Sequence, residues 1–145
     1  MDFTITIPGV PMAQPRPRAT TINGKSRVYQ PKTARDSKAT IQSHANDWIE
    51  NNPDWERLEG PVAVRITAVF KCPTSQYRKR SPQKAKFKSN GPDLDNVAKH
   101  YMDALCASGI VCNDDRQVAT LQVIKIQAAQ GEPPYTKVEI VPLIT

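Results

Sequence analysis

The chain has 145 residues, of which 39% are hydrophobic and 23% charged, and it carries a formal net charge of +6 at pH 7. This length and balance are typical of one soluble globular domain, so we expect residues 1–145 to fold as a single domain. No apolar run approaches the roughly 20 residues that cross a membrane, and the N-terminus lacks the basic start of a secretory signal. These features exclude a membrane-spanning protein and predict a cytoplasmic one.

The sequence offers few sulfur and nitrogen ligands for a metal. Cys72, Cys106 and Cys112 make an odd number without paired spacing, which indicates reduced thiols rather than disulfides. His44 and His100 are the only histidines, so we do not expect structural zinc. We interpret His100 as a surface or packing residue without a catalytic role.

The N-terminal half predicts a strand, a basic loop, a helix and a second strand. Residues Phe3–Ile7 alternate apolar and polar side chains, which is typical of a strand. A proline-rich basic loop follows, up to Arg27. Thr33–Asn52 contains neither proline nor glycine and predicts a helix that stops at Pro53. Pro61–Lys71 is rich in β-branched residues and predicts a strand.

The C-terminal half predicts a loop, a helix and two strands. Residues 71–91 form a basic loop that we expect to be mobile, broken by two prolines. A helix then begins after Pro92. Gln117–Ala129 and Thr136–Leu143 predict the last two strands, with a hairpin turn at Gly131–Pro134. The order β-α-β-α-β-β predicts an α+β domain in two layers, a small mixed β-sheet with two helices packed on it.

Two segments are basic and contain no acidic residue. Like charges repel, so two such segments in one small domain favour a polyanionic partner, and nucleic acid is the obvious one. Tyr77 and Phe87 lie in the second segment, where aromatic rings can stack on exposed bases. The candidate DNA-binding residues are Arg16, Arg18, Lys25 and Arg27 in the first segment, and Arg78, Lys79, Arg80, Lys84, Lys86 and Lys88 in the second.

The helix that follows the second basic segment begins with two acids. Asp93 is a good N-cap residue, whose carboxylate would accept bonds from free backbone N–H groups. Asp95 and Lys99 are four residues apart and therefore neighbours on one helix face. The apolar stripe that should face the sheet consists of Leu94, Val97, Ala98, Tyr101 and Leu105.

A second acidic pair, Asp114 and Asp115, stands directly before a strand. One interpretation is purely structural, with helix caps, a favourable helix dipole and an ordinary ion pair. The other is that the turn returns beside the helix, so that three or four carboxylates gather. Such a cluster repels strongly unless a cation is bound, and its hard oxygen ligands suit Mg²⁺ or Mn²⁺. A metal held beside basic loops can bind and hydrolyse a phosphodiester.

In combination, these motifs resemble the RusA family of Holliday junction resolvases. The matching stretches are "PDLDNVAKHYMDAL" at 92–105, "GIVCNDDRQV" at 109–118 and the opening "IPGVPMAQPRPRAT" at 7–20. The resemblance implies an endodeoxyribonuclease that depends on Mg²⁺. It also implies a homodimer that cuts branched DNA, namely four-way junctions, with paired nicks.

The resemblance also implies roles for single residues. Asp93, Asp95 and Asp115 would be the catalytic, metal-binding carboxylates, Lys99 the catalytic or phosphate-contacting lysine, and Asp114 an auxiliary ligand. The connection before the double aspartate is about one residue longer than in the family pattern, which leaves the choice between Asp114 and Asp115 open.

Two other functions remain: a nucleic-acid-binding module without chemistry, and a metal nuclease that acts on flaps or forks.

Overall fold

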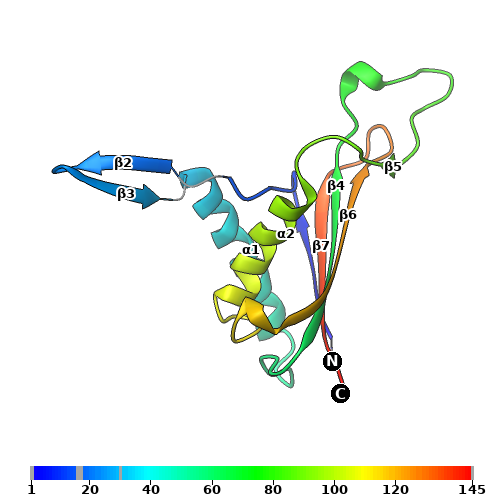
Figure 1. Cartoon of the computed structure of the whole chain (residues 1–145). Coiled ribbons are helices and arrows are strands. Elements are labelled where there is room, and N and C mark those ends of the chain that lie inside the picture. Colours follow the sequence, from blue (N-terminus) through cyan, green and yellow to red (C-terminus); the bar gives the residue numbers. More distant parts are fainter. Residues whose placement is uncertain (1, 16–17, 30, 145) are drawn as a thin grey trace.

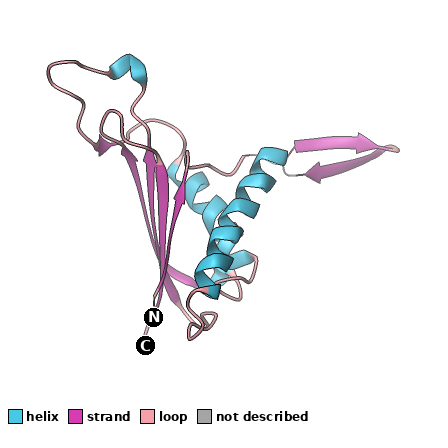
Figure 2. Cartoon of the chain, turned by 180° about the vertical axis from the view of Figure 1, so that it is seen from behind, coloured by secondary structure: helices cyan, strands magenta, loops and turns pink. Residues whose placement is uncertain are grey.

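The computed structural model describes residues 2–15, 18–29 and 31–144 of the chain. It has two layers, with helices α1 (Lys32–Glu50) and α2 (Leu94–Met102) packed on one face of a β-sheet (Figure 1). Figure 2 shows the same layers from behind, with both helices on one side of the strands and the other side of the sheet open over most of its length. In the described ranges, no helix has the length and apolar character needed to cross a membrane.

Five of the described strands form the sheet, in the order β1-β7-β4-β6-β5. β4 and β6 are parallel and the other neighbouring pairs are antiparallel, so the sheet is mixed. The parallel pair follows from the crossover through α2, because a chain needs such a connection to return in the same direction. The strands are β1 (Phe3–Pro8), β4 (Val62–Phe70), β5 (Lys86–Phe87), β6 (Val118–Gln127) and β7 (Tyr135–Pro142). This α+β architecture confirms the predicted fold class.

The core lies between the sheet and the helices. Phe3 of β1 packs edge-on against Trp48 of α1, with ring centroids 5.0 Å apart. Trp55, in the connection after α1, adds a third ring 5.6 Å from that of Trp48. The alternate residues Val62, Val64, Ile66, Ala68 and Phe70 of β4 are all buried toward the helices. The same core includes Val97, Ala98 and Tyr101 of α2, the helix that carries the first acidic pair at its start.

The first basic segment forms a hairpin, where the sequence predicted a loop. β2 (Arg18–Ile22) pairs antiparallel with β3 (Lys25–Tyr29), and the hairpin projects away from the two layers (Figure 1). Asn23 and Gly24 connect the strands with φ angles of 51° and 74°. Positive φ at both turn residues gives the twist that a two-residue hairpin needs, and Asn-Gly adopts it readily. The Asn-Gly pair was therefore the overlooked signal.

The hairpin predicted between the last two strands is wrong. β6 and β7 lie on opposite sides of β4, so their connection at 131–134 passes the end of β4 instead of joining neighbours. Local turn residues indicate where the chain reverses, but the partner of each strand depends on the whole sheet. The pairing of β7 with β1 on its other side could not be read from the turn.

The second basic segment, residues 71–90, contains regular structure. It has a 3-10 turn at Thr74–Gln76 and the short strand β5. Between these two elements the chain forms a loop, and the side chain of Gln130 bridges its two ends. The Oε1 atom of Gln130 accepts from the N–H groups of Arg78 and Gln83, each at 3.0 Å. Its Nε2 donates to the Arg78 carbonyl at 3.0 Å. The basic side chains are thus carried on an anchored segment next to the sheet.

Candidate active site

Asp93 and Asp95 stand exposed at the start of α2. Asp93 occupies the N-cap position with extended backbone, φ −65° and ψ 137°, but its side chain forms no capping hydrogen bond. The position was predicted correctly and the capping role of the carboxylate was not. Asp95 accepts one bond, from the Asn96 N–H to Oδ1 at 3.1 Å. Both carboxylates therefore keep most of their capacity to accept bonds from a ligand.

The predicted apolar stripe holds α2 against the sheet over most of its length. Val97, Ala98, Tyr101 and Leu105 are buried, as expected. Leu94 is the exception, with 43% of its surface exposed. After α2 the chain continues into a wider π-helical turn, Asp103–Ala107, whose residues Ala104, Leu105 and Cys106 are buried. α2 is therefore anchored firmly at its C-terminal end, and its first turn faces solvent.

Lys125 of β6 fixes the approach to the acidic pair. Its Nζ donates to the carbonyl oxygens of Asn90, at 2.7 Å, and Pro92, at 2.8 Å. Pro92 directly precedes Asp93, so a strand in the sheet sets the position of the helix start. Sequence motifs do not single out Lys125, because its partners are backbone oxygens.

Lys99 is exposed on α2, one turn after Asp95. These two residues, both within the described ranges, do not form the ion pair that the structural interpretation expected. Among the described ion pairs, the one nearest to Lys99 in sequence is formed by Asp103, whose Oδ2 lies 3.6 Å from Lys38 Nζ. Lys99 therefore remains free to contact an anion beside the helix start.

The second acidic pair forms a tight turn before β6. Asp114 caps the 3-10 turn Asp115–Gln117, since its Oδ1 accepts from the Asp115 N–H at 2.7 Å and its Oδ2 from Arg116 Nε at 2.6 Å. The bond from Arg116 holds the pKa of the Asp114 carboxyl below its usual value. The pKa of Asp115 is raised, chiefly by its hydrogen bond with the Asp114 side chain and also by repulsion from Asp114 and Asp103. Asp114 is thus committed to the turn, which leaves Asp115 as the better candidate ligand.

Gln117 holds this turn on the body of the protein. Its Oε1 accepts from the N–H groups of Asn113, at 2.6 Å, and Asp114, at 2.9 Å. Its Nε2 donates to the carbonyl oxygens of Leu58, at 3.0 Å, and Gly60, at 2.9 Å. The glutamine of the Asp-Asp-x-Gln motif therefore positions the acids by bonding to four backbone groups. Sequence reasoning noted the motif without this role.

The two acidic pairs do not converge within one chain, which corrects the geometry expected from the sequence. α2 runs antiparallel to β6, so Asp93 and Asp95 lie at the end of β6 that carries Lys125, while Asp115 precedes its beginning. At about 3.3 Å per residue, Val118 and Lys125 alone are separated by roughly 23 Å. Among the described residues, no three side chains of Asp, Glu, His or Cys form a group that could hold a metal ion.

The chemistry of the first pair nevertheless fits Mg²⁺. Asp93 and Asp95 are exposed carboxylates, and neither forms an ion pair with another described residue. Mg²⁺ is commonly held by one or two carboxylates, with waters and substrate phosphates completing its shell. Asp93 and Asp95 would hold such an ion, and a third carboxylate would have to come from outside this end of the chain.

His100 is buried in a polar network that the sequence did not indicate. Its surface is 0% exposed, its Nε2 lies 2.9 Å from Ser37 Oγ and its Nδ1 lies 3.1 Å from Gln14 Oε1. Burial is the largest cause that lowers the pKa of His100 to about 4, and the nearby charge of Lys38 adds to it. His100 is a neutral packing residue that links the N-terminal segment, α1 and α2.

The candidate DNA-binding residues occupy two places. Those of the second segment, Arg78, Lys79, Arg80, Lys84 and Lys86, are exposed, and Lys88 is half-buried with its Nζ 5.2 Å from the centroid of the Phe70 ring. Lys25 is exposed beside the hairpin turn. Arg16 lies outside the described residues, and the side chains of Arg18 and Arg27 are not described. The second segment leads directly into Asp93, so its positive charge borders the first acidic pair.

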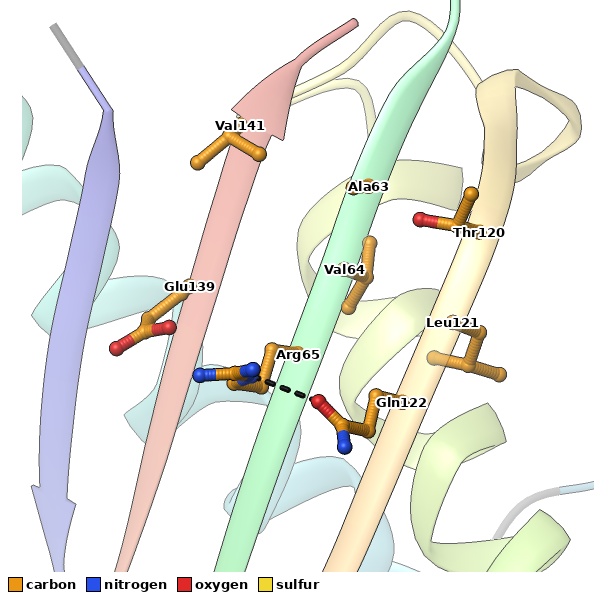
Figure 3. A pocket seen from close by; sticks show the side chains of 8 residues that line it. All are labelled: Ala63, Val64, Arg65, Thr120, Leu121, Gln122, Glu139 and Val141. Atoms are coloured by element: carbon orange, nitrogen blue, oxygen red, sulfur yellow. Dashed lines mark hydrogen bonds between the residues drawn. The ribbon is translucent and has the colours of Figure 1, made fainter.

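The outer face of the sheet has a hollow of about 320 Å³ (Figure 3). Its charged lining residues are Arg65 and Glu139, and Arg65 Nε donates to Gln122 Oε1 at 2.8 Å, the contact drawn in Figure 3. None of the candidate acids lines it. This hollow lies on the face opposite the helices and is not the candidate active site.

The sequence of this chain matches a known protein family and is similar to a known protein. The family model described as "Endodeoxyribonuclease RusA" matches residues 8–141, which include both acidic pairs and both basic segments. The chain is also similar to the "Uncharacterized protein YqaN" of Bacillus subtilis (strain 168). The two are 29% identical over 140 residues, which cover 93% of this chain and 92% of the relative.

Proposed function

Because this chain belongs to the RusA family of endodeoxyribonucleases, we propose that it is a Mg²⁺-dependent enzyme that resolves four-way DNA junctions as a homodimer. The observation that carries this proposal is the exposed pair Asp93 and Asp95, held at the start of α2 by Lys125 and bordered by the second basic segment. Such a placement suits an ion and a phosphate group together.

The free edge of β6 supports a symmetric pairing of two chains. β5 pairs with β6 at Ile126 and Gln127 alone, so the outward edge from Val118 to Ile124 has no strand partner among the described residues. Leu121, the midpoint of this stretch, is 45% exposed on the helix-bearing face. An open strand edge is a template for pairing. A two-fold axis near Leu121 would align two β6 strands antiparallel, as in a cyclic dimer.

This pairing would also bring the two acidic pairs together. With Leu121 at the axis, Val118 of one chain lies opposite Ile124 of the partner subunit, so the turn before Val118 extends toward the partner's Lys125. In each chain Lys125 binds the carbonyl of Pro92, next to Asp93. We therefore propose a site shared between chains, with Asp93 and Asp95 from one subunit and Asp115 from the other.

The residues of this site have separate tasks. A bound Mg²⁺ supplies charge neutralisation at the scissile phosphate and lowers the pKa of water. Asp93 and Asp95 would hold this ion, since within the chain only Asp95 Oδ1 accepts a described hydrogen bond, from the Asn96 N–H. Asp115 of the partner subunit would supply the third carboxylate to the ion. Lys99 lies one helical turn from Asp95 and stabilises the negative charge that develops on the phosphate before the 3′ oxygen leaves.

Positive charge on the second basic segment and on the hairpin holds the DNA backbone without reading its sequence. Each phosphate contact contributes about 0.9 to the slope of log affinity against log salt. Replacing Lys84, Lys86 and Lys88 together with alanine should therefore flatten this slope by about 2 to 3 for junction binding. An unchanged slope would show that these lysines do not contact the junction.

The function is tested with a labelled mobile four-way junction, incubated with and without Mg²⁺ and examined for symmetric nicks. Linear duplex, flap and fork substrates are run beside it. Wild-type protein should cut the junction in preference to the others and only with Mg²⁺. Asp95→Asn should abolish cutting while junction binding persists or tightens, because repulsion of phosphate is reduced. Binding without cutting would indicate a non-catalytic module, and equal cutting of all substrates would indicate a nuclease with another target.

A further inference from the structure

The outer face of the sheet carries an apolar row that the proposed active site does not use. Phe87 of β5 pairs with Ile126 of β6, Ile126 with Val69 of β4, and Val69 with Tyr135 of β7. Residues that are paired across neighbouring strands share a face. Phe87 is 81% exposed and Tyr135 38% exposed, so an aromatic ring stands at each end of the row.

Two shallow hollows follow this row. One, of about 200 Å³, is lined by Ala85, Lys86, Phe87 and Ile126. The other, of about 330 Å³, shares Ala85 and Ile126 with the first and continues past Val69 to Tyr135. Together they make a continuous apolar groove, which the second basic segment lines in part.

The charge around the groove indicates its occupant. The chain has no acidic residue from Lys71 to Pro92, and Lys86 lines the groove beside Phe87. Glu132 lines only the far end, near Tyr135. A polyanion with flat apolar groups fits this distribution, with its phosphates on the Lys86 side and a base on the ring of Phe87. Proteins that bind single-stranded nucleic acid combine these two elements, a basic track and an exposed aromatic ring.

A second copy of the chain fits less well. A two-fold contact through this row would bring two copies of the same basic segment face to face, and like charges oppose such a contact. We therefore propose that the Phe87 row is a stacking platform for an unpaired nucleotide of DNA. This proposal rests on the DNA binding of the proposed function and names the part of the branched substrate that the outer face contacts.

The test uses a short single-stranded oligothymidylate and a duplex of equal length, both without Mg²⁺. Phe87→Ala should weaken binding of the single strand by about tenfold, since one base loses its stacking partner, and change duplex binding less than about twofold. Phe87→Trp should retain affinity and lose indole fluorescence when the single strand is added. Ile144→Ala and Ile144→Trp are the matched controls, because Ile144 is 99% exposed near the opposite end of the sheet. The control indole should not respond.

Three results would overturn the platform. The first is an unchanged single-strand affinity of Phe87→Ala, and the second is an equal loss of affinity for single strand and duplex. The third is a molecular mass of Phe87→Ala in solution that differs from that of the wild type, which would assign the row to a contact between copies. None of these measurements depends on DNA cleavage, so the stacking platform and the proposed resolvase function can fail independently of each other. If the wild type cuts no junction but Phe87→Ala loses the single strand selectively, the resolvase function fails and the platform stands.

Discussion

Lys125 in the sheet donates a hydrogen bond from Nζ to the carbonyl oxygen of Pro92 at 2.8 Å, and Pro92 is the residue before Asp93. The same ammonium binds the Asn90 carbonyl at 2.7 Å. One side chain therefore determines where the acidic helix start stands relative to β6. Its described side-chain hydrogen bonds both go to backbone oxygens, so we expect its part in the site to be the positioning of Asp93 and Asp95.

Lys125→Met removes both bonds and keeps the length of the side chain. We expect the cutting rate at limiting Mg²⁺ to fall about tenfold, as is typical when a group that supports metal ligands is lost. Added Mg²⁺ should recover part of the rate, since the carboxylates themselves remain. Lys137→Met is the control, because Lys137 is an exposed β7 residue paired with Glu139. Equal rates for wild type and Lys125→Met would show that the helix start needs no such anchor.

Gln117 provides a second, separable prediction. Gln117→Leu leaves two N–H groups and two carbonyl oxygens of the backbone without their side-chain partner, some of them shielded from water. We expect a loss of about 1–3 kcal/mol in the free energy of unfolding, measured by urea denaturation. Gln122→Leu is the control, because it makes the same exchange of side chains. The wild-type Gln122 forms one exposed hydrogen bond, which its Oε1 accepts from Arg65 Nε. The control substitution should cost less than about 0.5 kcal/mol, and equal losses for the two variants would contradict this role.

The sequence predicted those parts of the fold that depend on local patterns. The alternation in Phe3–Ile7, the β-branched run before Lys71 and the apolar stripe of α2 all lie in the elements they indicated. The β2–β3 hairpin was missed because it was read together with the proline-rich stretch that directly precedes it, as one basic loop. The pairing of β7 with β1 and β4 depends on contacts between distant segments, which no local turn encodes.

The motifs predict which residues form the candidate site, but they do not predict its geometry. The expected convergence of Asp93, Asp95 and Asp115 assumed that the turn folds back beside the helix start. α2 instead spans the sheet in the direction opposite to β6, which carries the turn to the far end. The distance between two motifs depends on the directions of the elements that connect them, and spacing along the chain does not supply those directions.

His100 predicts how stability depends on pH. Its pKa is about 4 in the folded protein and 6.5 when unperturbed, so between these values the unfolded chain binds the proton and the folded chain does not. The free energy of unfolding should therefore fall as the pH is lowered from about 6.5 to 4, by up to about 3 kcal/mol from this residue, and level off below. His100→Gln should lack this part of the fall when denaturation is measured at pH 7, 5.5 and about 4. Identical pH profiles for wild type and His100→Gln would contradict it, and His44→Gln is the control.

A site shared between subunits predicts that two inactive variants restore each other. Asp95→Asn and Asp115→Asn should each be inactive alone. In a mixed dimer, one site combines both substitutions and the other has neither. When equal amounts are refolded together, about half of the dimers are mixed, so about a quarter of all sites should be intact. Each intact site nicks one strand. Junction cleavage on denaturing gels measures the recovery. The matched control mixes wild type with a chain that carries both substitutions. Its mixed dimers should be inactive, because each site receives one substitution, whereas a site within one chain would leave them half active and give no recovery in the first mixture.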